Sequence, residues 1–227
     1  MVGIVAAIKE ELESIKEYMS NIREENEFGN IFYIGKIGNS ECVLTLCGVG
    51  KVNAARSTQM LIGKYNPDYI INVGVAGGIS NRIKIGDIVI AEKLVQYDFD
   101  TTAFGDKLGE LPGGIGVFLN CDSKLVKKAE NVINRLSNLH SIIGTVATGD
   151  RFVTETDRSK EINSIFDADC VEMEGASIAQ VCYLDKIPFI VIRSISDSIN
   201  DNNKIDFETF AKSSAENAAT FVNEFLK

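Results

Sequence analysis

Histidine is nearly absent from this sequence, and its cysteines form no metal-binding pattern. The single histidine, His140, lies in a polar connector with no evident partner, which argues against a zinc site or a Ser-His-Asp triad. The five cysteines are an odd number, include no CxxC pair and lie mostly in apolar segments: Cys42, Cys47, Cys121, Cys170 and Cys182. We therefore expect buried free thiols rather than disulfides or a metal site, and no cofactor.

Long apolar runs and clusters of basic residues are missing as well. No apolar segment approaches the roughly 20 residues that a membrane-spanning helix needs. The first residues, MVGIVAAIKEELE, lack the basic start and the cleavage site of a signal peptide, so we expect a cytoplasmic protein without a membrane partner. The formal net charge of -9 argues against nucleic acid as a partner, because phosphate neutralisation requires clustered Lys and Arg.

What the chain does contain is a regular succession of apolar strands and amphipathic helices. Apolar runs predict extended segments at residues 2–8, 31–38, 41–48, 69–80, 86–100, 141–150 and 187–197, with a hairpin turn at 38–40. Helical spacing of apolar residues predicts helices at 10–22, 51–65, 122–136, 176–184 and 206–226. Residues 108–118, with Pro112 and four glycines, are expected to form a loop.

The predicted strands are apolar along their length rather than alternating, which indicates a sheet covered on both faces. Strands interleaved with helices predict a layered α/β fold. The 227 residues, 45% of them hydrophobic, suit one large domain or two small ones. Because no linker, repeat or low-complexity segment interrupts them, we expect a single domain over residues 1–227.

Charged residues stand where several of these strands end. Ligands of such sheets gather at the carboxyl ends of strands, here residues 7–11, 48–51, 74–78, 149–153 and 193–197. Glu10 and Glu11 follow the first strand, and Arg193 and Asp197 belong to the last. Each of these residues also has an ordinary structural explanation. The glutamates could stabilise the helix dipole by about 0.3–1 kcal/mol, and the arginine could form a local ion pair. The aspartate could cap a helix or stabilise a turn. Their convergence on one edge of the sheet favours a site.

The stretch VEMEGASIAQVC at 171–182 places two more carboxylates, Glu172 and Glu174, in front of a small-residue helix. Two glycine-rich turns lie nearby in the expected fold. The first, residues 48–51, is not a phosphate-binding P-loop, because Val52 stands where that motif needs Ser or Thr after the lysine. The second, residues 74–78, is not a GxGxxG motif but would let a ligand approach the backbone.

Carboxyl groups can cleave a glycosidic bond without histidine or metal. A carboxyl group in a dry pocket has a raised pKa and can donate a proton near pH 7, while an ionised carboxylate activates water. Together they suit cleavage through an oxocarbenium-like transition state, which negative charge in the pocket also favours. A positioned acid or base contributes about 10²–10⁴-fold in rate.

Eight stretches along nearly the whole chain resemble one enzyme family. They are AAIKEELE, CGVGKVNAA, NVGVAGGI, GDIVIAE, DTTAFG with LPG, TGDRFV, VEMEGASIAQVC and VIRSISD. The chain thus resembles the 5′-methylthioadenosine/S-adenosylhomocysteine nucleosidases of the nucleoside phosphorylase superfamily. The resemblance implies a three-layer α/β fold with a central mixed β-sheet flanked by helices, a homodimer, and hydrolysis of the adenine–ribose bond of 5′-methylthioadenosine and S-adenosylhomocysteine.

The resemblance also implies a role for each matching residue. Asp197 would protonate adenine N7 as the general acid, and Glu11 would orient or deprotonate the attacking water. Glu174 would hold the ribose hydroxyls, with Arg193 helping to fix Glu174 and the water. Phe104 and Pro112 would reach into the 5′-thioalkyl pocket of the partner subunit. The other implied substrate-binding residues are Ile8, Val49, Val75, Ala76, Gly77, Phe152, Val153, Glu172, Met173 and Ser196.

Within that list, Met173 would pack on the sugar and Phe152 would stack on adenine, while the backbone of Val153 would meet the base edge. Ser196 would steady Asp197. Glu172 is expected to be a supporting acid or an acid at the start of the helix.

The chain departs from the family pattern at two positions. Val75 stands where many members carry serine near the water, and Thr101 replaces an often apolar residue beside the 5′ pocket. Three alternatives stay open: a purine nucleoside phosphorylase, a non-catalytic nucleoside-binding protein, and a related nucleosidase acting on 5′-deoxyadenosine or 6-amino-6-deoxyfutalosine. The chain has only seven arginines and an acidic first strand exit, which favour water over phosphate as nucleophile.

Overall fold

A computed structural model describes residues 1–136, 138–198 and 207–227 of the chain. The strands are β1 (Val2–Ala6), β2 (Met19–Glu27), β3 (Asn30–Ile37), β4 (Ser40–Leu46), β5 (Tyr69–Gly78), β6 (Ile88–Gln96), β7 (Leu119–Asn120), β8 (Ser141–Thr148), β9 (Cys170–Glu172) and β10 (Phe189–Ser198). The helices are α1 (Lys9–Lys16), α2 (Lys51–Tyr65), α3 (Ser123–Ile133), α4 (Thr156–Phe166), α5 (Gly175–Asp185) and α6 (Phe207–Leu226), with a short 3₁₀ helix at Thr102–Phe104.

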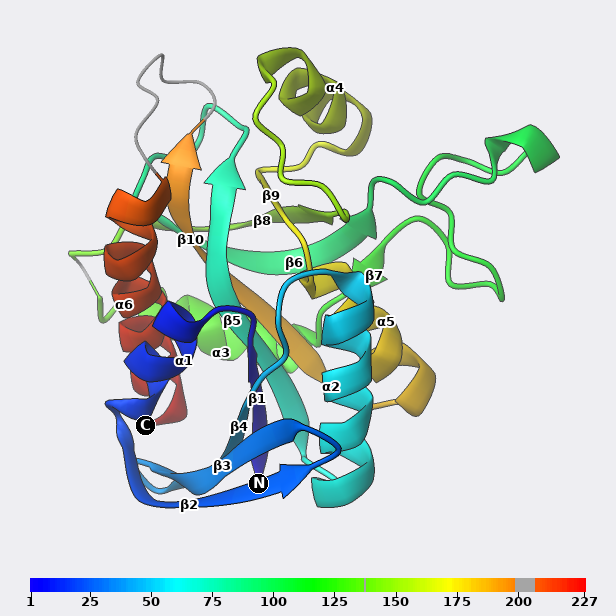
Figure 1. The fold of residues 1–227 in the computed structure, drawn as a ribbon. Coiled ribbons are helices and arrows are strands. Elements are labelled where there is room, and N and C mark those ends of the chain that lie inside the picture. The colour runs from blue at the N-terminus through cyan, green and yellow to red at the C-terminus, as the bar shows by residue number, and fades with distance from the viewer. Residues whose placement is uncertain (137, 199–206) are drawn as a thin grey trace.

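All the described strands belong to one mixed sheet, which partly closes on itself. Its order is β10-β6-β8-β9-β5-β1-β4-β3-β2, and β10 also pairs with β5. Strands β5, β9, β8, β6 and β10 therefore form a closed ring, from which β1, β4, β3 and β2 extend (Figure 1). Parallel pairs such as β1 with β5 and antiparallel pairs such as β10 with β6 coexist, which confirms the predicted mixed α/β sheet.

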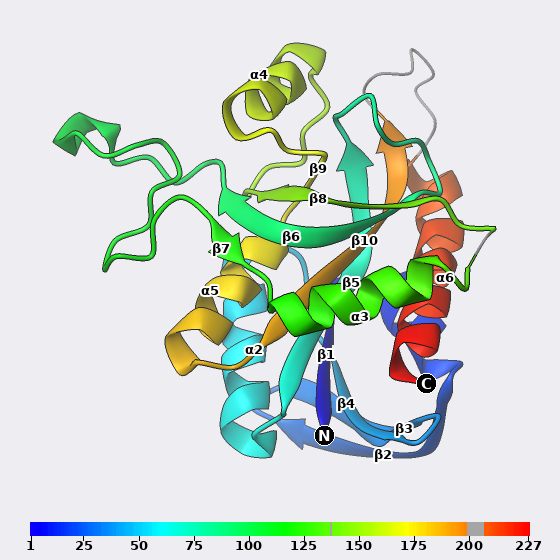
Figure 2. The ribbon, with the colours of Figure 1, turned by 180° about the vertical axis from the view of Figure 1, so that it is seen from behind.

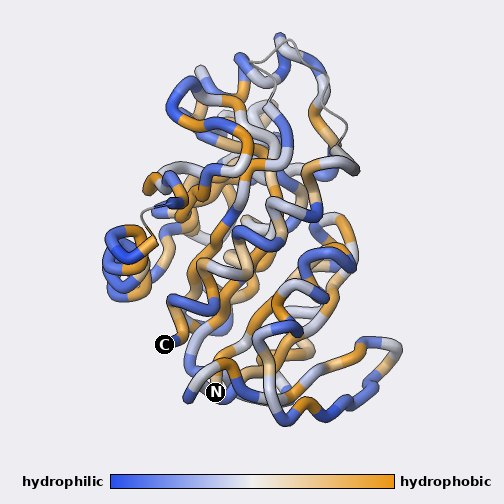
Figure 3. Tube along the Cα trace, turned by 90° about the vertical axis from the view of Figure 1, so that its left-hand side faces the viewer, coloured by the Kyte–Doolittle hydropathy of each residue, from blue (hydrophilic) through white to orange (hydrophobic). Residues whose placement is uncertain are grey.

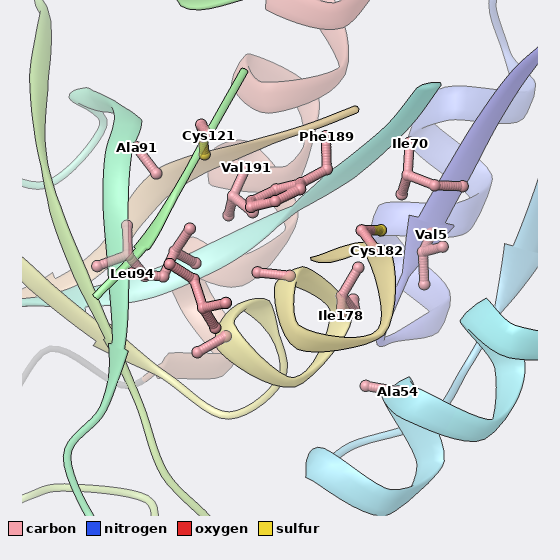
Figure 4. Packing of buried hydrophobic residues seen from close by; sticks show 14 of the residues in the cluster. Val5, Ala54, Ile70, Ala91, Leu94, Cys121, Ile178, Cys182, Phe189 and Val191 are labelled. Atoms are coloured by element: carbon pink, nitrogen blue, oxygen red, sulfur yellow. The ribbon is translucent and has the colours of Figure 1, made fainter. Parts of the chain in front are cut away.

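Helices cover both faces of the sheet, as the continuous apolar strands predicted. One hydrophobic core lies under α2 and α5, and a second lies under α1, α3 and α6 (Figures 1 and 2). A third, smaller core lies under α4. Neighbouring residues of one strand serve opposite cores: Val191 of β10 packs in the first, Ile192 in the second. Figure 4 shows Ile178 and Cys182 of α5 in the first core together with Phe189 and Val191 of β10. In Figure 3, hydrophobic stretches of the chain accordingly run through the middle of the molecule.

The predicted elements agree with the structure along most of the chain. Residues 51–65 form α2, and the hairpin at 38–40 joins β3 to β4. The five cysteines are free thiols, four of them buried. The expected start of the last helix at Asp206 lies outside the described residues, and α6 is described from Phe207.

One prediction is wrong: the helix expected over residues 10–22 ends at Lys16. Met19 and Ile22 belong instead to β2, which pairs antiparallel with β3 through Met19 and Ile37. Most of β2 is exposed, and Ile22 is 40% exposed, so pairing with β3 rather than burial in the core defines this strand. The spacing of Leu12, Ile15 and Met19 imitated a continuing helix. The short elements α4 and β9 were not predicted at all.

No helix in the described ranges is both long and apolar enough to cross a membrane.

A buried aspartate just before β9 connects this strand to the segment after β5 and to the middle of β8. Asp169, 2% exposed, accepts hydrogen bonds from Ser80 Oγ at 2.8 Å, from Thr145 N at 3.0 Å, and from Arg82 Nε at 3.0 Å and Nη2 at 2.6 Å. The Arg82 side chain is itself 60% exposed. The interior bonds of Asp169 should therefore stabilise the fold more than its ion pair with Arg82 does.

We expect Asp169→Ala to lower the free energy of unfolding by about 2–4 kcal/mol, because it leaves the Thr145 amide and the Ser80 hydroxyl unpaired. Arg82→Ala should cost about 1 kcal/mol or less, because its guanidinium is exposed. Urea denaturation of both variants measures the difference. An equal loss of stability in the two variants would show that the interior hydrogen bonds of Asp169 matter no more than its ion pair with Arg82.

Candidate active site

The chain segments at the predicted strand ends converge on one pocket that is open to solvent. Thirteen of the predicted residues line it: Ile8, Glu11, Val49, Val75, Ala76, Gly77, Phe152, Val153, Glu172, Met173, Glu174, Ser196 and Asp197. Ala7, Arg151 and Val171 also line the pocket; they fall inside the predicted segments 7–11, 149–153 and 171–182 but were not named as site residues.

Three predicted residues do not line this pocket. Arg193 lies buried behind it, 1% exposed. Phe104 is 87% exposed and Pro112 is exposed, both in the segment between β6 and β7 that extends from the body of the molecule (green in Figure 1). Their predicted role concerns a partner subunit, and it stays a prediction.

Glu11 connects the exits of β1 and β5. It lies in the first turn of α1, but its carboxylate turns back to accept hydrogen bonds from the amides of Ala7 (2.7 Å), Ile8 (3.1 Å) and Val75 (2.9 Å). Burial raises the pKa of Glu11, although the charge of Arg193 and these amides oppose the shift. Glu11 therefore does more than stabilise the helix dipole, whereas the neighbouring Glu10 is exposed.

Arg193 is the cation at the centre of the site. Its Nη2 donates to the carboxylate of Glu172 and to Asn72 Oδ1, and its charge also acts on Glu11 and Glu174. A Cβ atom at Gly74 would lie 2.5 Å from Glu11 Oε1 and 3.0 Å from Arg193 Nη1. A glycine at position 74 is thus what lets Glu11 and Arg193 approach each other.

The two glutamates of VEMEG have different surroundings. Glu172 accepts from Arg193, from the hydroxyl of Thr148, and from the amides of Glu174 (3.0 Å) and Gly175 (2.7 Å). The Glu172 carboxylate therefore fixes the start of α5, as predicted for an acid at a helix start. The carboxylate of Glu174 accepts the amide of Gly50 at 2.8 Å.

Glu174 is the more unusual of these two acids in its ionisation. Burial, followed by the nearby charge of Glu172, raises the pKa of Glu174 to about 8, while Arg193 opposes the shift. A carboxyl group with this pKa is mostly protonated at neutral pH. It combines an acceptor oxygen with a proton that it can share with a hydroxyl group of a ligand.

Asp197 lies near the end of β10, half-buried, with its carboxylate turned toward the pocket. Ser196 Oγ donates to Asp197 Oδ1 at 2.8 Å, as the steadying role predicted for Ser196 requires. A Cβ atom at Gly77 would lie 3.0 Å from Asp197 Oδ2, so the acid packs closely on the β5 backbone. Burial raises the pKa of Asp197, and the Ser196 hydrogen bond only partly offsets this. Asp197 is therefore suited to carry a proton into a reaction.

The pocket thus combines carboxyl groups in several electrostatic settings around one buried cation. In the described part of the chain, no cluster of three or more His, Cys, Asp or Glu side chains is arranged to hold a metal. Two supporting residues, Asn72 and Thr148, were not predicted. Their signal was a polar residue within an apolar strand, since both are fully buried.

Comparison with known proteins identifies the family to which this chain belongs. The model of the Phosphorylase superfamily matches residues 1–227. The 5′-methylthioadenosine/S-adenosylhomocysteine nucleosidase of Listeria monocytogenes is 40% identical over 230 residues, covering 100% of this chain and 98% of the relative.

Two solved structures extend the comparison to the fold. The Neisseria meningitidis nucleosidase in complex with methylthio-immucillin-A has a TM-score of 0.95 at 35% identity, covering 100% of this chain and 98% of its own. The futalosine hydrolase of Helicobacter pylori has a TM-score of 0.93 at 33% identity, covering 99% and 96% of the two chains. The chain therefore belongs to the 5′-methylthioadenosine/S-adenosylhomocysteine nucleosidase family of the phosphorylase superfamily.

Proposed function

We propose that this protein is an N-ribosyl hydrolase that cleaves 5′-methylthioadenosine and S-adenosylhomocysteine to adenine and the thioribose product. One observation carries the proposal: Glu11, Glu174 and Asp197, each with a raised pKa, line the same pocket. The relatives named above, among them a complex with a methylthio-substituted inhibitor, support the choice of substrate.

In the proposed reaction, Asp197 gives its proton to N7 of adenine while the bond between C1′ and N9 breaks. The electron pair of that bond passes to the base, which leaves neutral. A water oxygen forms the new bond to C1′, and Glu11, in its ionised form, accepts the proton that the water releases. The positive charge that develops on the ribose is stabilised by the carboxylates around it.

The remaining pocket residues supply binding in this proposal. Glu174 grips the ribose hydroxyls, and Met173 packs on the sugar. Phe152, 54% exposed at the pocket, stacks on adenine while the backbone of Val153 meets the base edge. Apolar Ile8 and Val49 suit a methylthio group.

Water rather than phosphate suits this pocket as the nucleophile. A phosphate nucleophile needs free cationic groups beside the attacking position. The Arg193 guanidinium is engaged by Glu172 and Asn72, and Arg151 is paired with Glu155 and 58% exposed. Glu11, whose ionised form would repel phosphate, borders the pocket instead.

We further propose a homodimer in which Phe104 and Pro112 complete the 5′ pocket of the partner. Both side chains are exposed here, and Val49 at the pocket is 47% exposed, so apolar surface is available for such a contact. The cytoplasmic location stays a prediction of the sequence. A second substrate, 6-amino-6-deoxyfutalosine, remains a candidate because of the similarity to the H. pylori futalosine hydrolase.

A panel of nucleosides tests the proposed activity. We expect adenine release from 5′-methylthioadenosine and S-adenosylhomocysteine in phosphate-free buffer, because the pocket presents a carboxylate where water must be activated. Chromatography of the free base, with 5′-deoxyadenosine, 6-amino-6-deoxyfutalosine and inosine in parallel, ranks the substrates. Release that strictly required phosphate would make the protein a phosphorylase.

Glu11→Gln should lower kcat for adenine release by about 10²–10⁴-fold with little change in KM, because activation of the water matters mainly in the transition state. Glu10→Gln is the matched control, since it changes the exposed neighbour in the same helical turn. Steady-state kinetics of both variants decide the point. A large rise in KM at unchanged kcat would assign Glu11 to substrate binding instead.

The raised pKa of Glu174 predicts how stability depends on pH. With a pKa near 4.5 when unfolded and about 8 when folded, Glu174 takes up a proton on folding between these values. The free energy of unfolding of the substrate-free protein should therefore fall as pH rises from about 5 to 8, by at most about 1.4 kcal/mol per pH unit for this proton. Urea denaturation should show a flatter dependence for Glu174→Gln. The same slope in both proteins would refute the assignment.

A further inference from the structure

A bulge in β10 sets the direction of Asp197. Strand β10 pairs with β5 in regular parallel register as far as Ile195 opposite Ala76, and pairing resumes with Asp197 opposite Gly77. Ser196 is therefore an extra residue in β10. Such a bulge re-aims the side chains that follow it. Here it brings the Ser196 hydroxyl within 2.8 Å of Asp197 Oδ1 and within 3.3 Å of the Ala76 carbonyl oxygen.

The residue before the bulge is held by a segment on its other side. The Ile195 amide donates to the Asp87 carbonyl at 2.9 Å, and the Ile195 carbonyl accepts the Gly86 amide at 2.8 Å. That same carbonyl accepts a second hydrogen bond, from Ser214 Oγ at 2.9 Å. Ser214 belongs to α6 and is 1% exposed. A helix distant in sequence from the pocket thus contacts the backbone two residues before Asp197.

A second side chain of α6 contacts Gly86, the residue whose amide donates to the Ile195 carbonyl. Asn217, nearly one turn after Ser214, donates from Nδ2 to the Gly86 carbonyl at 3.3 Å. Ser214 and Asn217 therefore hold both members of the Ile195–Gly86 pair. Helix α6 packs along β10 and β5, so this contact is part of a larger packed surface.

We propose that Ser214 is a positioning residue for Asp197, acting through the Ile195 carbonyl and the bulge; this rests on the proposed function, in which Asp197 protonates the leaving base. A general acid must stand about 2.6–3.2 Å from the atom that it protonates. A displacement of about 1 Å can cost about 10²-fold in rate. Without the Ser214 hydroxyl, the Ile195 carbonyl keeps one of its two hydrogen bonds, and the bulge loses its tie to α6.

The chain offers a matched control for the purely structural effect of such a change. Ser159 of α4 is 3% exposed, and its Oγ also donates to a backbone carbonyl, that of Glu155 at 3.0 Å. Ser159→Ala therefore also removes a hydrogen bond from a serine hydroxyl to a backbone carbonyl, here a local one at the start of α4 and away from the bulge. Any loss of activity common to both variants reflects stability alone.

The experiment compares Ser214→Ala, Asn217→Ala and Ser159→Ala in the full-length protein, with 5′-methylthioadenosine as substrate and urea denaturation alongside. Ser214→Ala should lower kcat about 10-fold or more, with KM within about twofold of the parent value, because the acid is misplaced while the binding groups are not. Asn217→Ala should lower kcat less, and Ser159→Ala should leave both constants unchanged.

Equal kcat values for Ser214→Ala and Ser159→Ala would overturn the proposal, as would a rise in KM at unchanged kcat. If Ser214→Ala does not fold, Asn217→Ala decides: an unchanged kcat in that variant rejects the positioning role. Asp197→Asn, measured in parallel, separates this inference from the proposed function. Near-parental turnover by folded Asp197→Asn would show that the acid is misassigned. If Asp197→Asn loses its turnover while Ser214→Ala keeps the parent kcat, only the role of Ser214 is rejected.

Discussion

The buried charge of Arg193 organises the site, because the carboxyl groups of Glu11, Glu172 and Glu174 all interact with this one cation. Its guanidinium pairs with Glu172, and its charge opposes the effect of burial on both Glu11 and Glu174. An isolated buried ion costs several kcal/mol, so neither the arginine nor this group of acids would be stable in the interior without the other. The close approach at Gly74 is the geometric condition for this arrangement.

The closed part of the sheet explains how residues from distant parts of the chain reach one pocket. Strand β10 pairs with both β5 and β6, which brings Asp197 next to Gly77 and sets Arg193 opposite Gly74. Strand β9 pairs with β5 and β8, which delivers Glu172 beside Thr148. Helix α5 begins directly after β9, with Glu174 as its N-cap residue. At this turn the amides of Glu174 and Gly175 donate to the carboxylate of Glu172 and fix it. In this way one carboxylate is held by the backbone and the next faces the pocket.

Much of this was predictable from sequence because it depends on local patterns. Continuous apolar strands indicated a doubly covered sheet, and most acids at the strand ends proved to line one pocket. Elements that depend on distant pairing were not predictable: β2 is a mostly exposed strand that exists through its pairing with β3. The same reason applies to the contacts of Glu11 with Val75 and of Arg193 with Asn72, which join residues 64 and 121 positions apart. The bulge at Ser196 likewise arises only from the register between two strands.

The central claim is that these carboxylates direct water, and no other nucleophile, to C1′ of the ribose. The most direct measurement is cleavage of 5′-methylthioadenosine in ¹⁸O-labelled water containing phosphate. The sugar product is reduced with borohydride as it forms, and product incubated alone in labelled water corrects for exchange. The account predicts one ¹⁸O atom at C1′ and no sugar phosphate. A 1-phosphorylated sugar lacking the label would contradict it.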